Sequence, residues 1–214
     1  MIERPAAVVF DCDGVLVDSE PHSLTAWVDV LCQYGHPATQ ADIDGCVGLG
    51  FGPTVAALGA IEPLPTSGEV WPLLLDALER SFAEGLVVFA DAIAVLDAVD
   101  AAGLPLAVAS ASPRQRLDLT LRVANLTDRF VVSVAGDEVA ASKPDPAVYL
   151  AALEALGRPA SGAVAIEDTV AGTLAAVAAG MGVVAVARDN DSTGPLRDAG
   201  ALVVGSLDPA DLGF

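Results

Sequence analysis

The sequence predicts an α/β protein with a parallel sheet and a helical insert after the first strand. The apolar run 6–10 has the length of a buried strand and ends in two aspartates separated by one residue. The stretch 17–87 shows helical patterns and no convincing strand. From residue 88 onward, short strand-type runs alternate with helical segments, which is typical of βαβ units.

The insert is predicted to open with a long helix. This helix begins near Val15, can be capped by Asp18 or Ser19, and ends before Gly35 and Pro37. Large apolar residues recur within it at helical spacing, so one of its faces is expected to be buried.

Three further segments of the insert have helical patterns: 39–47, 54–58 and 70–82. A glycine-dense loop, 48–53, separates the first two of these segments. Pro63 and Pro65 break the chain before the longest segment. A helical insert of this size fits a lid over an α/β core.

The rest of the chain is predicted to complete the sheet and its covering helices. The expected strands are 104–109, 131–135, 163–166, 183–186 and 202–204. The expected helices are 92–101, 114–124, 147–156, 170–179 and 195–199. These segments divide the chain into a catalytic core, 1–16 and 88–214, and a helical cap, 17–87.

Charge and hydropathy narrow the classes of partner. The 214 residues carry 29 acids against 10 bases, a net charge of −19, which argues against nucleic acid and anionic membranes. The mean hydropathy is +0.56, yet polar residues interrupt every apolar stretch before the roughly 18 to 20 residues that a membrane span needs. A phosphate site in such an acidic chain has to be built locally, by a metal and a few donors.

The cysteines and the N-terminal residues favour a cytoplasmic location. Cys12, Cys32 and Cys46 are an odd and scattered set, which predicts reduced thiols and no disulfide framework. No basic region precedes an apolar one at the start, so no signal peptide is expected. We expect a monomer, although no feature of the sequence specifies the oligomeric state.

Four of the predicted strands lead into polar residues. These are Asp11 and Asp13 after the first strand, Ser110, Ala111 and Ser112 after the second, Lys143 beyond the third, and Glu167 and Asp168 after the fourth. The carboxyl ends of parallel strands lie at one edge of the sheet, so these residues are expected in one crevice. Each has a simpler explanation in isolation, as a helix cap, a surface lysine or a helix-start acid. Their occurrence together and in this order favours a functional site.

The same stretches resemble the four motifs of the haloacid dehalogenase superfamily. They are Asp11-Cys12-Asp13-Gly14-Val15, Ser110-Ala111-Ser112, Lys143-Pro144-Asp145-Pro146 and Ile166-Glu167-Asp168. The insert resembles that of the C1-cap members, which include sugar-phosphate phosphatases and β-phosphoglucomutase. The resemblance spans essentially the whole chain and is weakest in the insert. It implies a Rossmann-like core, Asp11 as nucleophile, and Asp13 as general acid/base and, through its backbone carbonyl, as a metal ligand.

The residue types fit phosphoryl transfer independently of that resemblance. A carboxylate such as Asp11 can attack phosphorus and split hydrolysis into two steps. Nucleophile and phosphate are both negative, and Mg²⁺ bound by oxygen ligands removes that repulsion. Asp168, with Glu167 beside it as a ligand or close neighbour, can supply the remaining protein oxygens. The expected cofactor is therefore Mg²⁺.

Other residues are expected to handle the phosphoryl oxygens and the proton. Lys143 supplies a point charge, and the Ser110 hydroxyl and the Ala111 backbone N–H are suitable donors. Asp13, two residues beyond Asp11, can protonate the leaving group and then deprotonate water. Gly48 and Gly50, in the loop 48–53, are expected to contact the substrate.

Three functions remain open at this stage, with a phosphatase favoured. Dehalogenases of the superfamily lack an acid at the position of Asp13, which favours phosphoryl chemistry. A mutase must also grip a second phosphate with cap cations, yet Arg80 is the only Lys or Arg between Val15 and Phe89.

Two further sequence features point in opposite directions on the question of a mutase. Alignment places Ser23 where the mutase hinge has a histidine, and His22 stands one position away. In the other direction, the stretches 110–112 and 137–143 look mutase-like. A non-catalytic protein that binds phosphorylated metabolites is the third reading, and the intact acid pair speaks against it. The favoured function is an Mg²⁺-dependent phosphatase for a small phosphorylated metabolite, such as a sugar phosphate, through an aspartyl phosphate.

Overall fold

The computed structural model describes residues 4–36, 39–46, 51–59, 66–189 and 191–214, and it confirms the α/β class. Six strands form one parallel sheet in the order β5-β4-β1-β6-β7-β8. The strands are β1 (Ala7–Phe10), β4 (Leu106–Ala109), β5 (Val132–Val134), β6 (Ala163–Glu167), β7 (Gly182–Val186) and β8 (Leu202–Val204). β1 lies in the middle, between β4 and β6, so the residues that follow it reach the centre of the sheet's edge.

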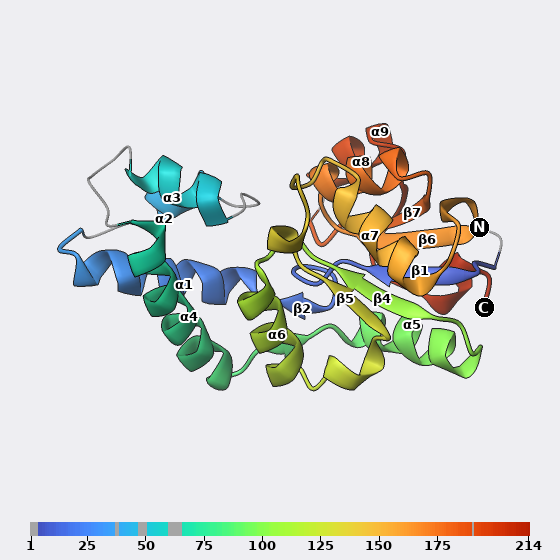
Figure 1. Cartoon of the computed structure of the whole chain (residues 1–214), viewed down its shortest axis with the longest axis horizontal. Coiled ribbons are helices and arrows are strands. Elements are labelled where there is room, and N and C mark those ends of the chain that lie inside the picture. Colours follow the sequence, from blue (N-terminus) through green and yellow to red (C-terminus); the bar gives the residue numbers. More distant parts are fainter. Residues whose placement is uncertain (1–3, 37–38, 47–50, 60–65, 190) are drawn as a thin grey trace.

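Helices cover both faces of the sheet (Figure 1). One layer holds α5 (Ala90–Ala101) and α6 (Arg114–Val123), and the other holds α7 (Ala147–Leu156), α8 (Val170–Ala178) and α9 (Thr193–Asp198). Successive residues of β1 therefore point to opposite faces of the sheet and pack against different helix layers. Val8 and Phe10 pack in the cluster with α5 and α6, while Val9 packs in the cluster with α7, α8 and α9. Short 3₁₀ turns complete the core at Thr127–Arg129, Gly136–Glu138, Ala160–Gly162 and Pro209–Leu212.

The insert is helical, as predicted, and lies to one side of the sheet (Figure 1). Its helices are α1 (Glu20–Gln33), α2 (Gln40–Asp44), α3 (Phe51–Gly59) and α4 (Ser67–Ala83). It has a hydrophobic cluster of its own, in which Trp27 of α1 packs with Leu74 and Leu78 of α4. Leu119 of α6 belongs to this cluster, so the insert packs against the core through α6. The division into a core and a cap stays a prediction.

Two short strands at the ends of the insert correct the sequence interpretation. β2 (Val17–Asp18) pairs antiparallel with β3 (Val87–Val88), whereas no strand was expected between these positions and a helix was expected from Val15. The helix instead begins at Glu20. A strand of two residues is too short to show alternation, and it exists because a distant segment supplies its hydrogen-bond partners.

The glycine-dense loop is the other point of difference. Its residues 48–50 lie outside the described residues, so the expected contacts of Gly48 and Gly50 stay predictions. Phe51, Gly52 and Pro53 form the first turn of α3 and not a loop, because proline is compatible with the first turn of a helix. Among the helices of the described residues, none is both long and apolar enough to cross a membrane.

Candidate active site

Asp11 stands at the carboxyl end of the central strand. Its backbone N–H donates to the Ile166 carbonyl at 2.9 Å, which continues the pairing of β1 with β6 for one more residue. Its side chain is buried, with 6% of the residue exposed, and Oδ1 lies 2.5 Å from Lys143 Nζ. The carboxylate is therefore held at the edge of the sheet by backbone pairing on one side and an ion pair on the other.

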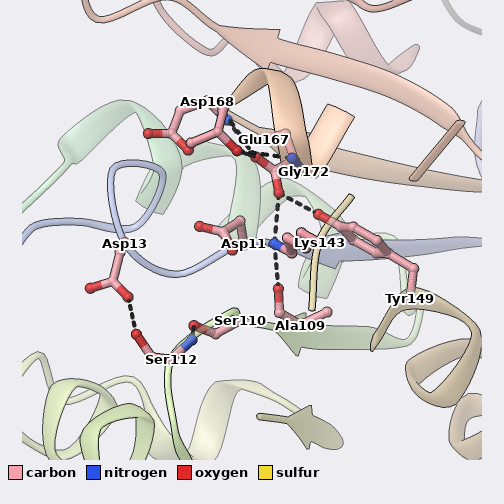
Figure 2. A network of polar contacts seen from close by, with 11 residues as sticks. Asp11, Asp13, Ala109, Ser110, Ser112, Lys143, Tyr149, Glu167, Asp168 and Gly172 are labelled. Carbon is pink, nitrogen blue, oxygen red and sulfur yellow. Dashed lines mark hydrogen bonds and ion pairs between the residues drawn. The ribbon is translucent and has the colours of Figure 1, made fainter. Parts of the chain in front are cut away.

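Lys143 joins three of the four predicted strand ends (Figure 2). Its Nζ donates to Asp11 Oδ1, to Glu167 Oε1 at 2.7 Å and to the Ala109 carbonyl at 3.1 Å. Burial by itself would lower the pKa of Lys143, but the charges of Asp11 and Glu167 outweigh it and hold the pKa well above its usual value. The lysine is therefore a fixed positive charge beside the Asp11 carboxylate.

Glu167 accepts hydrogen bonds on both carboxylate oxygens. Oε1 accepts from Lys143 and, at 2.7 Å, from the Tyr149 hydroxyl. Oε2 accepts from the backbone N–H groups of Asp168 and Thr169 and from the Thr169 hydroxyl. Burial would raise the pKa of Glu167, yet Lys143 and these hydrogen bonds lower it. Glu167 therefore holds Lys143 in place, and it could bind a cation only by giving up part of this network.

Asp168 is the residue whose environment best fits a bound cation. Its Oδ1 is buried and has no hydrogen-bond partner within the described part of the chain. Burial and the nearby charges of Glu167 and Asp11 raise the pKa of Asp168 well above its usual value. Burial likewise raises the pKa of Asp11 to about 7, against the effect of Lys143. One oxygen from each of these three acids lies within 4.8 Å of the others, which is a suitable donor set for a hard divalent ion.

Asp13 lies on the other side of Asp11 and has a different set of partners. Oδ2 accepts from the Ser112 hydroxyl at 2.8 Å, and Oδ1 accepts from the Ser19 hydroxyl and, at 3.1 Å, from Arg116 Nη2. Burial would raise the pKa of Asp13, but Arg116 and the two hydroxyls outweigh it and lower the pKa. The two aspartates therefore sit in different electrostatic environments, which raise the pKa of Asp11 and lower that of Asp13.

The loop 110–112 is packed from behind by a glycine. The buried Ser110 Oγ accepts the Ser112 N–H at 3.0 Å, and Gly136 N–H donates to the Ser112 carbonyl at 2.9 Å. A Cβ at Gly136 would lie 2.3 Å from the Ala111 carbonyl oxygen, so only glycine permits this approach. A helix cap was the simpler explanation for Ser112 in isolation. In the structure its hydroxyl donates to Asp13.

The sequence interpretation gave no role in this site to Tyr149, Thr169 or Arg116. Tyr149 follows the apolar pattern of α7, and Thr169 looks like an ordinary helix cap, which it also is through its bond to the Gly172 N–H. Arg116 is one of two arginines at the start of a polar helix. His22, whose role the sequence left open, donates or accepts a hydrogen bond with Ser81 at 2.8 Å and packs edge-on to Phe82. Those contacts place His22 in the packing of α1 against α4.

Gly172 offers a test of the glutamate network. A Cβ at this position would lie 1.7 Å from Glu167 Oε1, so Gly172→Ala has to displace the carboxylate that holds Lys143. We expect a loss of about 1–3 kcal/mol in the free energy of unfolding, the range for overpacking, together with reduced activity. The matched control is Gly194→Ala in α9, where a Cβ meets nothing within 4 Å and no loss is expected. Equal unfolding midpoints for both variants in urea would contradict the tight packing of Gly172 on Glu167.

Comparisons with known proteins identify the family of this chain. A family model described as haloacid dehalogenase-like hydrolase matches residues 8–186. The chain is 32% identical to the "Phosphorylated carbohydrates phosphatase" of Thermotoga maritima over 92% of this chain and 93% of that protein. It is 33% identical to "Protein SUPPRESSOR OF QUENCHING 1, chloroplastic" of Arabidopsis thaliana over 94% of this chain, but spans only 19% of that longer protein.

A solved structure with bound ligands shares the fold of this chain. It is a HAD family hydrolase from Deinococcus radiodurans R1 with bound phosphate and sodium. The TM-score is 0.71 and the identity 31%, over 98% of this chain and 93% of that one.

Proposed function

Since this chain belongs to the haloacid dehalogenase-like hydrolases, we propose that it is an Mg²⁺-dependent phosphatase that hydrolyses a phosphorylated sugar through an aspartyl phosphate on Asp11. The observation that carries the proposal is the buried Asp11–Lys143 pair, next to an Asp168 oxygen that has no partner among the described residues. A carboxylate beside a fixed positive charge and a second carboxylate suited to a metal ion can accept a phosphoryl group. The T. maritima relative supports the substrate class.

The residues present fit a divalent cation. The carboxylates of Asp11 and Asp168 and the backbone carbonyl of Asp13 would hold it, and Glu167 would support Lys143 or contribute an oxygen. When bound, Mg²⁺ neutralises charge on the phosphate and orients it for attack.

The proposed reaction has two steps at Asp11. A carboxylate oxygen of Asp11 forms a bond to phosphorus, the ester bond breaks, and Asp13 gives a proton to the departing oxygen. Asp13 then takes a proton from water, whose oxygen bonds to phosphorus and releases inorganic phosphate and Asp11. Lys143 stabilises charge on the phosphoryl oxygens, and the Ser110 hydroxyl and Ala111 N–H donate to them.

The helical insert is proposed to act as a cap over this edge of the sheet. β2 and β3 pair where the chain leaves and re-enters the core, and the Phe89 N–H donates to the Leu16 carbonyl at 3.0 Å. A pivot at these two crossings would let the insert open for substrate and close to exclude water. A monomeric state and a cytoplasmic location also stay predictions.

The structure supplies a further argument for a phosphatase over a mutase. Arg80, the one basic residue of the insert sequence, pairs with Asp76 on the exposed side of α4. A mutase needs a cap cation for the second phosphate, and this exposed, acid-paired arginine is the only Lys or Arg that the insert sequence offers.

The metal requirement is the first test of this function. We expect phosphate release from a panel of sugar phosphates to stop in excess EDTA and to return with Mg²⁺. Calorimetry of the purified protein should show Mg²⁺ binding, weakened about a hundredfold or more by Asp168→Asn, since loss of a ligand exceeds the effect of an outer contact.

The control for this test is Asp128→Asn, an exposed aspartate in the turn Thr127–Arg129. It should bind Mg²⁺ like the wild type. Full activity in EDTA would overturn the metal requirement. Conversion of β-glucose 1-phosphate into glucose 6-phosphate, faster than phosphate release, would replace the phosphatase by the mutase.

A further inference from the structure

Arg116 is a cation beside the general acid that the reaction described above does not use. It stands in the first turn of α6, directly after the loop 110–112. Both of its hydrogen bonds use Nη2, which donates to Asp13 Oδ1 at 3.1 Å and to Ser23 Oγ at 2.8 Å. It therefore lies between the core and α1 of the insert, since Ser23 belongs to α1.

The guanidinium has donors to spare. Its side chain is mostly buried, with 18% exposed, and Nε is buried without a hydrogen-bond partner in the described ranges. A buried donor without an acceptor destabilises the folded state, so such a group in a native fold calls for an explanation. An acceptor on a bound substrate provides one.

The position of Arg116 indicates which part of the substrate it meets. Asp13 is proposed to protonate the oxygen of the leaving group, so a group that touches Asp13 borders the path of that leaving group. Lys143 is on the opposite side, bonded to Asp11 and Glu167. The phosphoryl group and the leaving group thus have separate cations.

Arg114 and Arg188 pair with acids other than the two aspartates Asp11 and Asp13. Arg114 pairs with Glu138 and Asp118, and Arg188 pairs with Asp91. Asp13, the ion-pair partner of Arg116, also accepts hydrogen bonds from the hydroxyls of Ser19 and Ser112. Asp13 would keep these two bonds if the guanidinium turned to a ligand. The cost of that exchange is therefore limited.

We propose that Arg116 recognises the leaving group, and that the site favours phosphorylated sugars whose leaving group carries a second anion, a carboxylate or a phosphate. The planar guanidinium fork is well matched to either group. This inference rests on the proposed phosphatase function and adds the substrate class to it.

Matched pairs of substrates test the proposal. One pair is 6-phosphogluconate and sorbitol 6-phosphate, which have the same carbon chain and differ in a carboxylate against a hydroxymethyl group. A shorter pair is phosphoglycolate and 2-hydroxyethyl phosphate. We expect kcat/KM of the wild type to favour the anionic member of at least one pair about ten- to hundredfold, the equivalent of one charge-assisted hydrogen bond.

The variant Arg116→Gln should reduce this ratio to near one, mostly through KM of the anionic member. Arg116→Lys, which keeps the charge but not the fork, should retain part of the preference, and it replaces Arg116→Gln if that variant fails to fold. The control is Arg80→Gln on the exposed face of α4, which should leave the ratio unchanged.

Three outcomes would overturn the proposal. The wild type could show no preference in either pair. Arg116→Gln could keep the preference. Arg116→Gln could also lower kcat of both members equally with the ratio unchanged, which would make Arg116 a positioning residue for Asp13. Failure of the phosphatase function is a separate result, namely no Mg²⁺-dependent phosphate release from any sugar phosphate. In that case the dissociation constants of the two compounds of each pair, measured for the wild type and for Arg116→Gln, still test whether Arg116 recognises the second anion.

Discussion

Replacing Asp11 by asparagine abolishes phosphoenzyme formation and turnover together. Asparagine keeps the size of the side chain but lacks the nucleophilic charge, so no acyl phosphate can form. It also removes one of the anionic oxygens that lie within 4.8 Å of one another, which should weaken Mg²⁺ binding. The measurement is acid-quenched single turnover with a ³²P-labelled sugar phosphate, in which the wild type should show label on protein and Asp11→Asn none.

This variant is expected to remain folded. Burial raises the pKa of Asp11 to about 7, so the charged carboxylate lowers the free energy of unfolding at neutral pH. A neutral amide removes that cost, and Lys143 keeps its ion pair with Glu167 at 2.7 Å. The thermal midpoint should therefore stay level or rise.

A control and a contradicting result complete this test. Asp97→Asn, at an exposed ion pair with Arg129, should retain labelling and turnover. Labelled protein in Asp11→Asn would assign the nucleophile to another residue.

Replacing Asp13 by asparagine lowers the rate by about two to four decades while leaving Mg²⁺ bound. The range is that of general acid–base catalysis. The substitution keeps the backbone carbonyl proposed as a metal ligand and an acceptor for Ser19 or Ser112, but it cannot shuttle a proton. Calorimetry should give a dissociation constant for Mg²⁺ close to that of the wild type.

The loss caused by Asp13→Asn should depend on the leaving group. p-Nitrophenolate departs without protonation, so the first step should suffer less than with a sugar phosphate. The second step still needs a base, so phosphoenzyme should accumulate from p-nitrophenyl phosphate. Equal losses on both substrates without accumulation would remove Asp13 from the proton transfer and leave it a structural role.

The pattern of strands and helices in the core could be predicted because it depends on local sequence. α7 and β8 match their expected limits, and the other core strands and α-helices differ by one or two residues at one or both ends. Apolar runs of strand length and helical spacing are properties of neighbouring residues, and they are sufficient where burial follows the same pattern. The pair β2 and β3 was missed because two-residue strands carry no pattern of their own.

The residues of the candidate site could be predicted from local sequence in the same way, whereas their contacts could not. Asp11, Asp13, Lys143, Glu167 and Asp168 could be selected from the sequence because each follows a predicted strand, and parallel topology brings strand ends to one edge. The roles given to them stay predictions that the variants above test.

The partners of those residues came only from the tertiary structure. Tyr149 donates to Glu167 across 18 residues, and Arg116 reaches Asp13 across 103. Neither residue looks unusual in its own helix, since one follows an apolar pattern and the other a polar one. Composition and spacing determine which elements form and which residues end at the edge of the sheet. The docking of helices on that sheet decides which buried donors meet which carboxylates, because hydrogen bonds depend on distances in space and not along the chain.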